Sequence, residues 1–128
     1  MWERREVEGF GPWSKKGGMQ HVEPRFEILA KMVTVRIHLD DCGVSNAPLL
    51  IASGSHRLGR VPAKEAAGHA QRIGAEACLA EAGDVWLYAT PILHASERAA
   101  IPAQRKVVQV DYATVGLLGG LEWFGLNR

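Results

Sequence analysis

Hydrophobic and polar residues alternate strictly along residues 33–39, with a period of two. The hydrophobic positions are Val33, Val35, Ile37 and Leu39, and the polar positions are Thr34, Arg36 and His38. Successive side chains of a β-strand point to opposite faces, so this pattern predicts a strand with one hydrophobic and one polar face.

Shorter stretches of the same kind follow along the chain. Further strands are predicted at residues 48–52, 85–89 and 106–112, with shorter extended pieces at 75–80 and 93–95. The alanine-rich stretch 63–70 predicts a helix, and residues 23–32 predict one or two helical turns with Pro24 near the start. Short strands separated by turns, with little helix, are typical of an antiparallel sandwich or barrel.

The two ends of the chain lack a clear period. Residues 1–31 contain four glycines, two prolines and two tryptophans before the first strand, and we expect them to form an irregular, partly packed segment. Residues 32–113 form the predicted β core. Residues 114–128 are hydrophobic and rich in glycine, which favours a lid or a partner surface. A chain of 128 residues is expected to form one domain.

Composition narrows the class of protein. Fifteen basic residues against fourteen acidic ones favour neither nucleic acid nor an anionic membrane as a partner. The sequence has no hydrophobic run long enough to span a bilayer and begins without the hydrophobic stretch of a signal peptide. The two cysteines, Cys42 and Cys78, form no metal or disulfide motif. We therefore expect a cytoplasmic protein with reduced thiols and a small-molecule substrate; the oligomeric state stays open.

Three residues near the C-terminus suggest a specific chemistry. His94 is followed by Ser96 after two residues and by Arg105 after eleven. An imidazole is a suitable ligand for Fe(II), and a guanidinium binds a carboxylate through two parallel hydrogen bonds. An iron oxygenase with a 2-oxo acid co-substrate needs both groups close together.

The sequence resembles phytanoyl-CoA dioxygenase-like proteins over roughly residues 32–113. The resemblance is carried by ordered motifs at residues 34–41, 46–59, 82–88 and 94–113. It implies a double-stranded β-helix, of the jelly-roll or cupin-like kind, that uses Fe(II) and 2-oxoglutarate to hydroxylate a small molecule.

The resemblance also implies roles for single residues. His94 matches the distal iron ligand, Arg105 the arginine that holds the far carboxylate of 2-oxoglutarate, and Ser96 the hydroxyl that assists it. Arg36 matches a position that contacts the co-substrate in family members. His38 lies on the same strand face as Arg36, so it is a candidate to line the substrate cavity.

The other two iron ligands leave two alternatives open. The family normally supplies a histidine and a carboxylate as His-x-Asp, and the local candidate here is His21 with Glu23. Alternatively, that motif lies upstream of Met1 and this chain is the C-terminal half of a longer family member. The chain length and about five credible strands, where a double-stranded β-helix has eight, favour the second alternative and an incomplete barrel.

These alternatives lead to two hypotheses about function. The first is an oxygenase of the phytanoyl-CoA dioxygenase-like type. The second is a catalytically silent β-sandwich fragment, or a small-anion-binding module, without a complete iron triad. Asp40 and Asp41 have the charge of metal ligands, but their position after the first strand favours turn capping.

Overall fold

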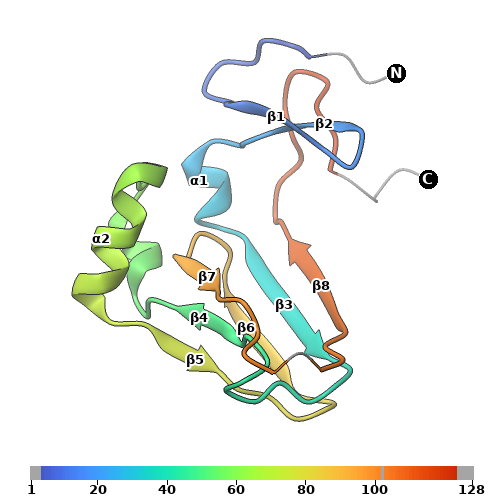
Figure 1. Ribbon diagram of the computed structural model, residues 1–128. Helices are drawn as coiled ribbons and strands as arrows, with labels where there is room; N and C mark the ends of the chain where they lie inside the picture. Colours follow the sequence, from blue (N-terminus) through green and yellow to red (C-terminus); the bar gives the residue numbers. More distant parts are fainter. Residues whose placement is uncertain (1–3, 102, 124–128) are drawn as a thin grey trace.

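The computed structural model describes residues 4–101 and 103–123 (Figure 1). Its elements are β1 (Trp13–Lys16), β2 (Met19–Val22), α1 (Phe26–Leu29), β3 (Val33–His38), β4 (Leu49–Ile51), the 3-10 helix η1 (Ser55–Leu58), α2 (Ala63–Ile73), β5 (Glu76–Cys78), β6 (Val85–Ala89), β7 (His94–Ser96) and β8 (Val107–Tyr112). The strands and helices predicted after residue 32 are all present, most of them within one or two residues of the predicted ends.

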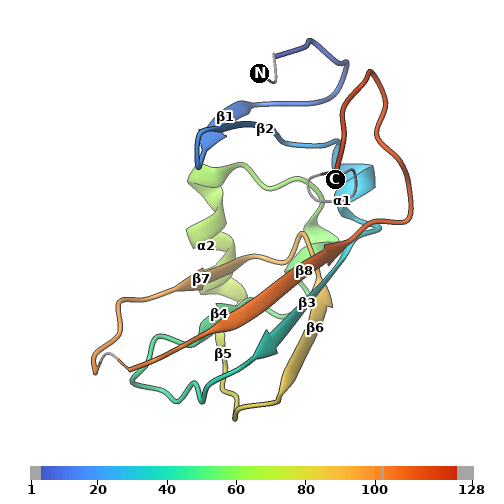
Figure 2. The ribbon, with the colours of Figure 1, turned by 90° about the vertical axis from the view of Figure 1, so that its right-hand side faces the viewer.

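Strands β3 to β8 form two antiparallel sheets of three strands each (Figures 1 and 2). One sheet has the order β6-β3-β8 and the other has the order β5-β4-β7. Strands β6, β7 and β8 enter the two sheets in turn, which is the winding of a double-stranded β-helix. The predicted mostly-β architecture is therefore confirmed. The two sheets contain six strands within the described residues.

The central strand β3 buries its polar face. Thr34 and His38 are 2% and 1% exposed, whereas Val33, on the other face, is 38% exposed. Arg36 shares the inner face and is registered opposite Trp86 of β6 and Gln109 of β8. The space between the sheets is therefore lined by polar side chains from β3.

The hydrophobic core is small and belongs mainly to the second sheet. Its buried members are Leu49, Ile51, Cys78 and Ile92, and the half-buried Trp86 and Tyr88 pack against it. Trp86 and Tyr88 come from β6, so these two aromatic rings join the sheets. Burial raises the pKa of the Cys78 thiol, and the nearby Glu76 carboxylate adds to this effect.

The N-terminal segment is more regular than the sequence predicted. Residues 1–31 were expected to be irregular, but β1 and β2 form an antiparallel hairpin with Lys16 registered opposite Met19. Gly17 and Gly18 have φ angles of 55° and 81°, the positive values that a two-residue hairpin turn of type I′ requires. The hairpin escaped prediction because β1 does not alternate: three of its four residues are polar and exposed.

The described part of the C-terminal tail packs against the N-terminal segment. The Trp123 indole donates a hydrogen bond to the Val115 carbonyl at 2.9 Å. A Cβ placed on Gly119 would lie 2.6 Å from a Val7 methyl, so glycine permits the close approach. Residues 124–128 of the predicted tail lie outside the described residues, and a role as lid or partner surface stays a prediction.

Three aspartates accept hydrogen bonds from backbone amides in the connections between the strands. Asp40 accepts a hydrogen bond from the Lys106 amide at 2.7 Å, and Asp41 accepts one from the Ala82 amide at 2.8 Å. Asp84 accepts a third from the Glu81 amide at 2.8 Å. Asp40 and Asp41 thus bond to connecting segments that are 66 and 41 residues away in sequence, and capping of their own turn stays a prediction. None of the helices in the described ranges is long and hydrophobic enough to cross a membrane.

Candidate functional site

The inner face of the first sheet has a network of polar contacts at its β8 side. The Thr34 hydroxyl donates a hydrogen bond to the Asp111 carboxylate at 2.6 Å and lies 3.0 Å from the Thr90 hydroxyl. Two residues further along β3, on the same face, the Arg36 guanidinium donates a hydrogen bond to the Gln109 side chain at 3.0 Å. These contacts fix the β3 side chains in the space between the sheets.

Arg36 lies at the centre of this space. Burial raises the pKa of the Tyr88 hydroxyl, and the neighbouring Arg36 charge acts against that rise. The Nε atom of Arg36 is buried and has no hydrogen-bond partner among the described residues. A half-buried guanidinium with one buried, spare donor is a site where an anionic ligand gains a strong hydrogen bond.

His38 is the most buried polar side chain of the inner face. Burial lowers the pKa of His38, and Arg36 and Arg105 lower it further, while Asp84 acts in the opposite direction. The imidazole is therefore neutral at physiological pH. Neither ring nitrogen has a hydrogen-bond partner among the described residues. Such orphaned groups are costly in a folded protein unless water or a ligand satisfies them.

His94 belongs to the inner face of the second sheet. It is registered opposite the buried Ile51, and its ring centroid lies 6.5 Å from that of Tyr88. Nδ1 of His94 lies 2.9 Å from the Ile92 carbonyl oxygen, which can only accept, so Nδ1 carries the proton and donates. The lone pair of the neutral ring is then on Nε2. Metal-binding histidines are commonly oriented by this kind of bond.

Ser96 and Arg105 lie near the same part of the second sheet. Ser96 is registered opposite Leu49, two positions from His94, and therefore shares the inner face with it. Arg105 is half-buried and donates hydrogen bonds from Nη1 to the carbonyls of Asn46, at 3.3 Å, and Ala47. This contact places the guanidinium beside the backbone that leads into β4, close to Leu49.

Asn46 holds the segment that carries Arg105. Its side-chain oxygen accepts a hydrogen bond from the Ala103 amide at 3.2 Å, and its side-chain nitrogen donates to the Gln104 carbonyl at 3.3 Å. Asn46 is 7% exposed, so these bonds are shielded from water. Asn46 was not predicted as a site residue, because its sequence context indicates a turn.

Tyr88 was also missed. Its position in β6, two residues after Trp86, places it on the inner face, where it contacts His94 and lies beside Arg36. The alternation of residues 85–89 contains this signal, since Trp86 and Tyr88 are in phase. It could not be used until the register of β6 against β3 was known.

His21 and Glu23 are not brought together with His94. His21 is on β2, opposite Ser14 in the N-terminal hairpin, and Glu23 forms an ion pair with Arg60 at 3.1 Å. Within residues 4–101 and 103–123, no three histidine, cysteine or acidic side chains are placed so that they could hold a metal ion. His94 fits the role of an iron ligand, but the described residues do not supply a complete iron site.

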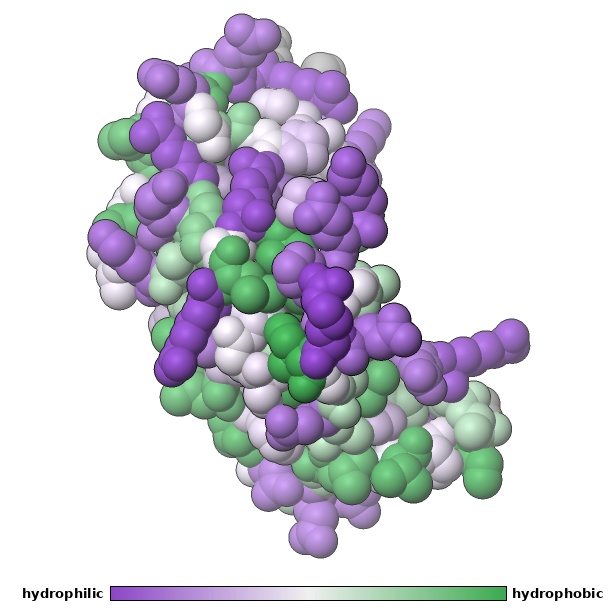
Figure 3. All heavy atoms as spheres, turned by 90° about the vertical axis from the view of Figure 1, so that its left-hand side faces the viewer, coloured by the Kyte–Doolittle hydropathy of each residue, from purple (hydrophilic) through white to green (hydrophobic). Residues whose placement is uncertain are grey.

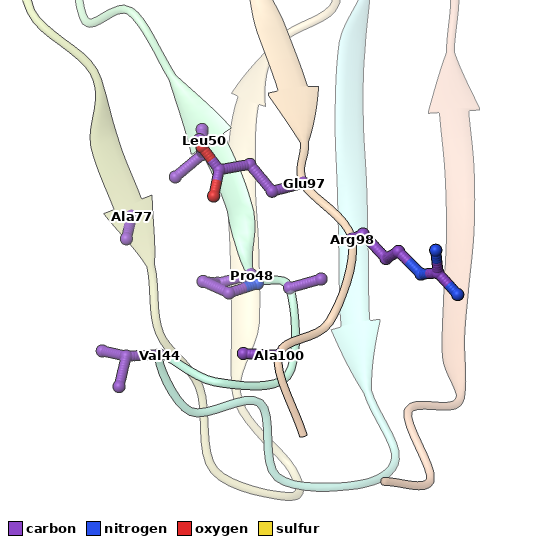
Figure 4. A pocket seen from close by; sticks show the side chains of 8 residues that line it. Val44, Pro48, Leu50, Ala77, Glu97, Arg98 and Ala100 are labelled. Carbon is purple, nitrogen blue, oxygen red and sulfur yellow. The ribbon is translucent and has the colours of Figure 1, made fainter. Parts of the chain in front are cut away.

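A separate cavity lies on the other face of the second sheet. It has a volume of about 160 Å³ and is lined by Val44, Ala47, Pro48, Leu50, Ala77, Glu97, Arg98 and Ala100 (Figure 4). Leu50 and Ala77 are registered opposite each other, on the face that points away from His94. The Arg98 side chain extends away from the cavity. We therefore do not assign the candidate site to this cavity.

Comparison with known proteins agrees with the fold. Residues 8–107 match the family model for phytanoyl-CoA dioxygenase (PhyH). Crystal structures of EctD from S. alaskensis, one with bound Fe and one in its apoform, are similar with a TM-score of 0.58 and 25% sequence identity. A third, with 2-oxoglutarate and 5-hydroxyectoine, has the same TM-score and 24% identity. A comparison with curated protein sequences gave no significant match.

The similarity to EctD covers 70% of this chain and 32% of the EctD chain. The matched part of this chain therefore spans about a third of the length of the EctD chain. The match to the family model, in contrast, extends over most of the 128 residues. The chain belongs to the phytanoyl-CoA dioxygenase (PhyH) family.

Proposed function

We propose that the protein acts as an Fe(II)- and 2-oxoglutarate-dependent oxygenase that hydroxylates a small molecule. The observation that carries this proposal is the orientation of His94, whose Nδ1 donates to a backbone carbonyl and leaves Nε2 available on the inner face of the second sheet. The membership of the family and the similarity to EctD with bound Fe support it.

The co-substrate is assigned to the same region. Ser96 shares the inner face with His94, and Arg105 is fixed nearby through the carbonyls of Asn46 and Ala47. Arg105 uses Nη1 for these bonds, so its other donors remain for a carboxylate. Arg36, with its buried Nε, offers a second guanidinium in the space between the sheets. The proposal is that Arg105 and Ser96 hold the far carboxylate of 2-oxoglutarate.

His38 is the proposed contact for the small-molecule substrate. It points into the same space as Arg36, is almost fully buried, and has two unpartnered ring nitrogens. A neutral imidazole can donate with one nitrogen and accept with the other, which suits a hydroxyl or amide group of a ligand. The two orphaned nitrogens support a ligand or an ordered water at this position.

A complete iron site requires more than this chain's described residues provide. In this proposal His94 supplies one imidazole, and the described residues do not bring a second imidazole and a carboxylate to it. We propose that they belong to a His-x-Asp motif outside the 128 residues. The buried, unpaired Cys42 and Cys78 fit the cytoplasm, where thiols stay reduced, and we include that location in the proposal.

A second candidate function is a small-anion-binding module that does not turn over its ligand. The observation in its favour is that the described residues lack a three-ligand metal group, while Arg36 and Arg105 still provide an anion site. The two candidates differ in chemistry, because 2-oxoglutarate oxygenases convert the 2-oxo acid to succinate. An anion-binding module binds the acid unchanged.

The test measures binding and turnover separately. Isothermal titration calorimetry of the 128-residue chain with 2-oxoglutarate, with and without Fe(II), reports binding. Succinate formation, followed by mass spectrometry on a longer polypeptide that also contains the proposed His-x-Asp motif, reports turnover. Arg98→Ala is the matched control for Arg105→Ala, because Arg98 is an exposed arginine seven residues away.

The outcomes separate the candidates. Succinate that depends on Fe(II) and disappears in His94→Ala supports the oxygenase. Binding lost in Arg105→Ala but kept in Arg98→Ala, without succinate, favours the anion-binding module for this chain. Absence of 2-oxoglutarate binding in the wild-type chain contradicts both assignments of Arg105.

A further inference from the structure

Three consecutive residues in the turn before β4 hold the segment that leads to Arg105. The Ser45 carbonyl accepts a hydrogen bond from the Ile101 amide at 3.1 Å. The carbonyls of Asn46 and Ala47 both accept from one nitrogen of Arg105, Nη1. This turn therefore binds both the backbone and the charged end of a segment that lies more than fifty positions away in sequence.

The side chain of Asn46 adds two further bonds to the same segment. Its Oδ1 accepts from the Ala103 amide at 3.2 Å, and its Nδ2 donates to the Gln104 carbonyl at 3.3 Å. The carboxamide thus pairs with the backbone in the way that the peptide group of a neighbouring strand would. The two bonds fix the direction of the backbone immediately before Arg105.

These bonds lie in a hydrophobic part of the molecule. Asn46 is 7% exposed, and Cys42 and Leu49, on either side of it in sequence, are 1% and 7% exposed. On the face that Figure 3 shows, hydrophilic side chains cover the upper half and hydrophobic ones lie mainly below, at the end where this turn lies in Figure 1. A buried carboxamide costs free energy unless its partners are met, so an asparagine here needs a reason beyond packing.

The backbone at Ala47 is strained. Its φ angle is 49°, in the left-handed region that residues other than glycine rarely adopt. Such strain persists only where the surrounding contacts hold the residue in place. At Ala47 these contacts include the hydrogen bond from Arg105 to its carbonyl, so the strained residue presents that carbonyl to the guanidinium.

We propose that Asn46 is a positioning residue for Arg105, and that it sets the affinity of the site for a 2-oxo acid without touching the acid. The inference rests on the proposed function, in which Arg105 holds the far carboxylate. A guanidinium forms two parallel bonds with a carboxylate only when its free edge faces that carboxylate. Because Nη1 is held by the carbonyls of Asn46 and Ala47, the backbone before Arg105 decides where the remaining donors point.

A purely structural role for Asn46 is the alternative. In that case the loss of its side chain lowers the free energy of unfolding, and any change in ligand binding follows from the weaker fold. The two roles differ in one measurable respect. An effect that acts through Arg105 disappears when Arg105 is removed, whereas an effect on the fold remains.

The test is a double-mutant cycle on the 128-residue chain. Isothermal titration calorimetry with 2-oxoglutarate, run to millimolar concentrations, gives the dissociation constants of wild type, Asn46→Ala, Arg105→Ala and the double variant. Hydrogen exchange of the Ala103 amide, followed by NMR, reports whether its bond to Asn46 is lost. Asp41→Ala, alone and with Arg105→Ala, is the matched control, because Asp41 is in the same turn but bonds the Ala82 amide at 2.8 Å instead of the segment that carries Arg105.

Asn46→Ala is expected to raise the dissociation constant about tenfold in the wild-type background and less than about twofold in the Arg105→Ala background. The Ala103 amide exchanges faster in Asn46→Ala, and Asp41→Ala changes neither the affinity nor this exchange rate. An equal rise in both backgrounds overturns the proposal in favour of a structural role. A rise in Asp41→Ala equal to that in Asn46→Ala overturns it as well.

The remaining outcomes separate this inference from the proposed function. Wild type that does not bind 2-oxoglutarate overturns the proposed function, and the role of Asn46 with it. Wild type that binds, with Asn46→Ala unchanged in affinity, leaves the proposed function intact and overturns only the inference. If circular dichroism shows that Asn46→Ala is misfolded, Asn46→Ser replaces it, and a smaller rise is expected because a hydroxyl can meet one of the two backbone groups.

Discussion

The two faces of the β6-β3-β8 sheet differ in polarity and in burial, and the more polar face is the buried one. The inner face carries Thr34, Arg36 and His38. The outer face is hydrophobic at all nine registered positions, which are Val33, Val35, Ile37, Val85, Leu87, Ala89, Val108, Val110 and Tyr112. Yet Thr34 and His38 are buried, while Leu87 is 66% exposed. A protein whose interior needed only packing would bury the other face. The difference therefore indicates that the inner face is kept polar for a ligand.

The largest expected effect concerns the polar interior and its proposed ligand. Arg105→Ala weakens 2-oxoglutarate binding by about 2–4 kcal/mol, because it removes a charge-assisted contact with a carboxylate. Arg105→Lys recovers only part of the affinity, since an ammonium cannot form the two parallel bonds of a guanidinium. Calorimetry measures both variants. Equal affinity in wild type and Arg105→Ala would remove the co-substrate from this position.

The next effect tests whether the buried polar network stabilises the fold. Thr34→Val keeps the shape of the side chain but removes the hydroxyl that bonds Asp111 and Thr90. The Asp111 carboxylate then loses a short hydrogen bond, and we expect the free energy of unfolding to fall by about 1–3 kcal/mol. Urea unfolding, with the slope checked against wild type, gives the value. A midpoint equal to wild type would show that water replaces the hydroxyl without cost.

A pH titration sharpens the same comparison through His38. Burial, with help from Arg36 and Arg105, lowers the pKa of His38 in the folded protein below its usual value near 6.5. Below pH 6.5 the unfolded chain therefore binds a proton that the folded chain does not bind, and the free energy of unfolding falls as the pH falls. The slope from this residue is at most about 1.4 kcal/mol per pH unit.

The control for the titration is His38→Gln, which has no proton to bind in this range. Its unfolding free energy should depend less on pH between neutral and mildly acid conditions than that of wild type. The difference between the two curves isolates His38 from the other titrating groups. Parallel curves for wild type and His38→Gln would mean that His38 gains its proton equally in both states.

The alternation in residues 33–39 was sufficient to predict β3 and its polar face, but not which face would be buried. Burial depends on the second sheet, because His94 and the core around Ile51 pack on the side where Tyr88 of the first sheet lies. Local sequence contains no record of that contact. The same limit explains Asn46, whose hydrogen bonds to residues 103 and 104 cross more than fifty positions of sequence.

The candidate site was predictable where its residues are close in sequence. His94 and Ser96 are two residues apart in one strand, so their shared face follows from the alternation of β7. The proposed placement of Arg105 beside them relied on the resemblance of this sequence to the phytanoyl-CoA dioxygenase-like proteins. His21 and Glu23 also have a plausible spacing, but their strand pairs within the hairpin and Glu23 is paired with Arg60. Spacing alone could not distinguish the pair His94 and Ser96, which shares the inner face, from the pair His21 and Glu23, which does not.

The smallest effect comes from the outer face and completes the comparison with Thr34→Val. Val33 is the neighbour of Thr34 in sequence but points outward and is 38% exposed. Val33→Thr exchanges a methyl for a hydroxyl that can reach water, so the free energy of unfolding should change by less than about 0.5 kcal/mol. Urea unfolding measures this value. If Val33→Thr destabilises the protein as much as Thr34→Val does, the outer face is packed as tightly as the inner face, and the contrast in burial between the two faces would no longer hold.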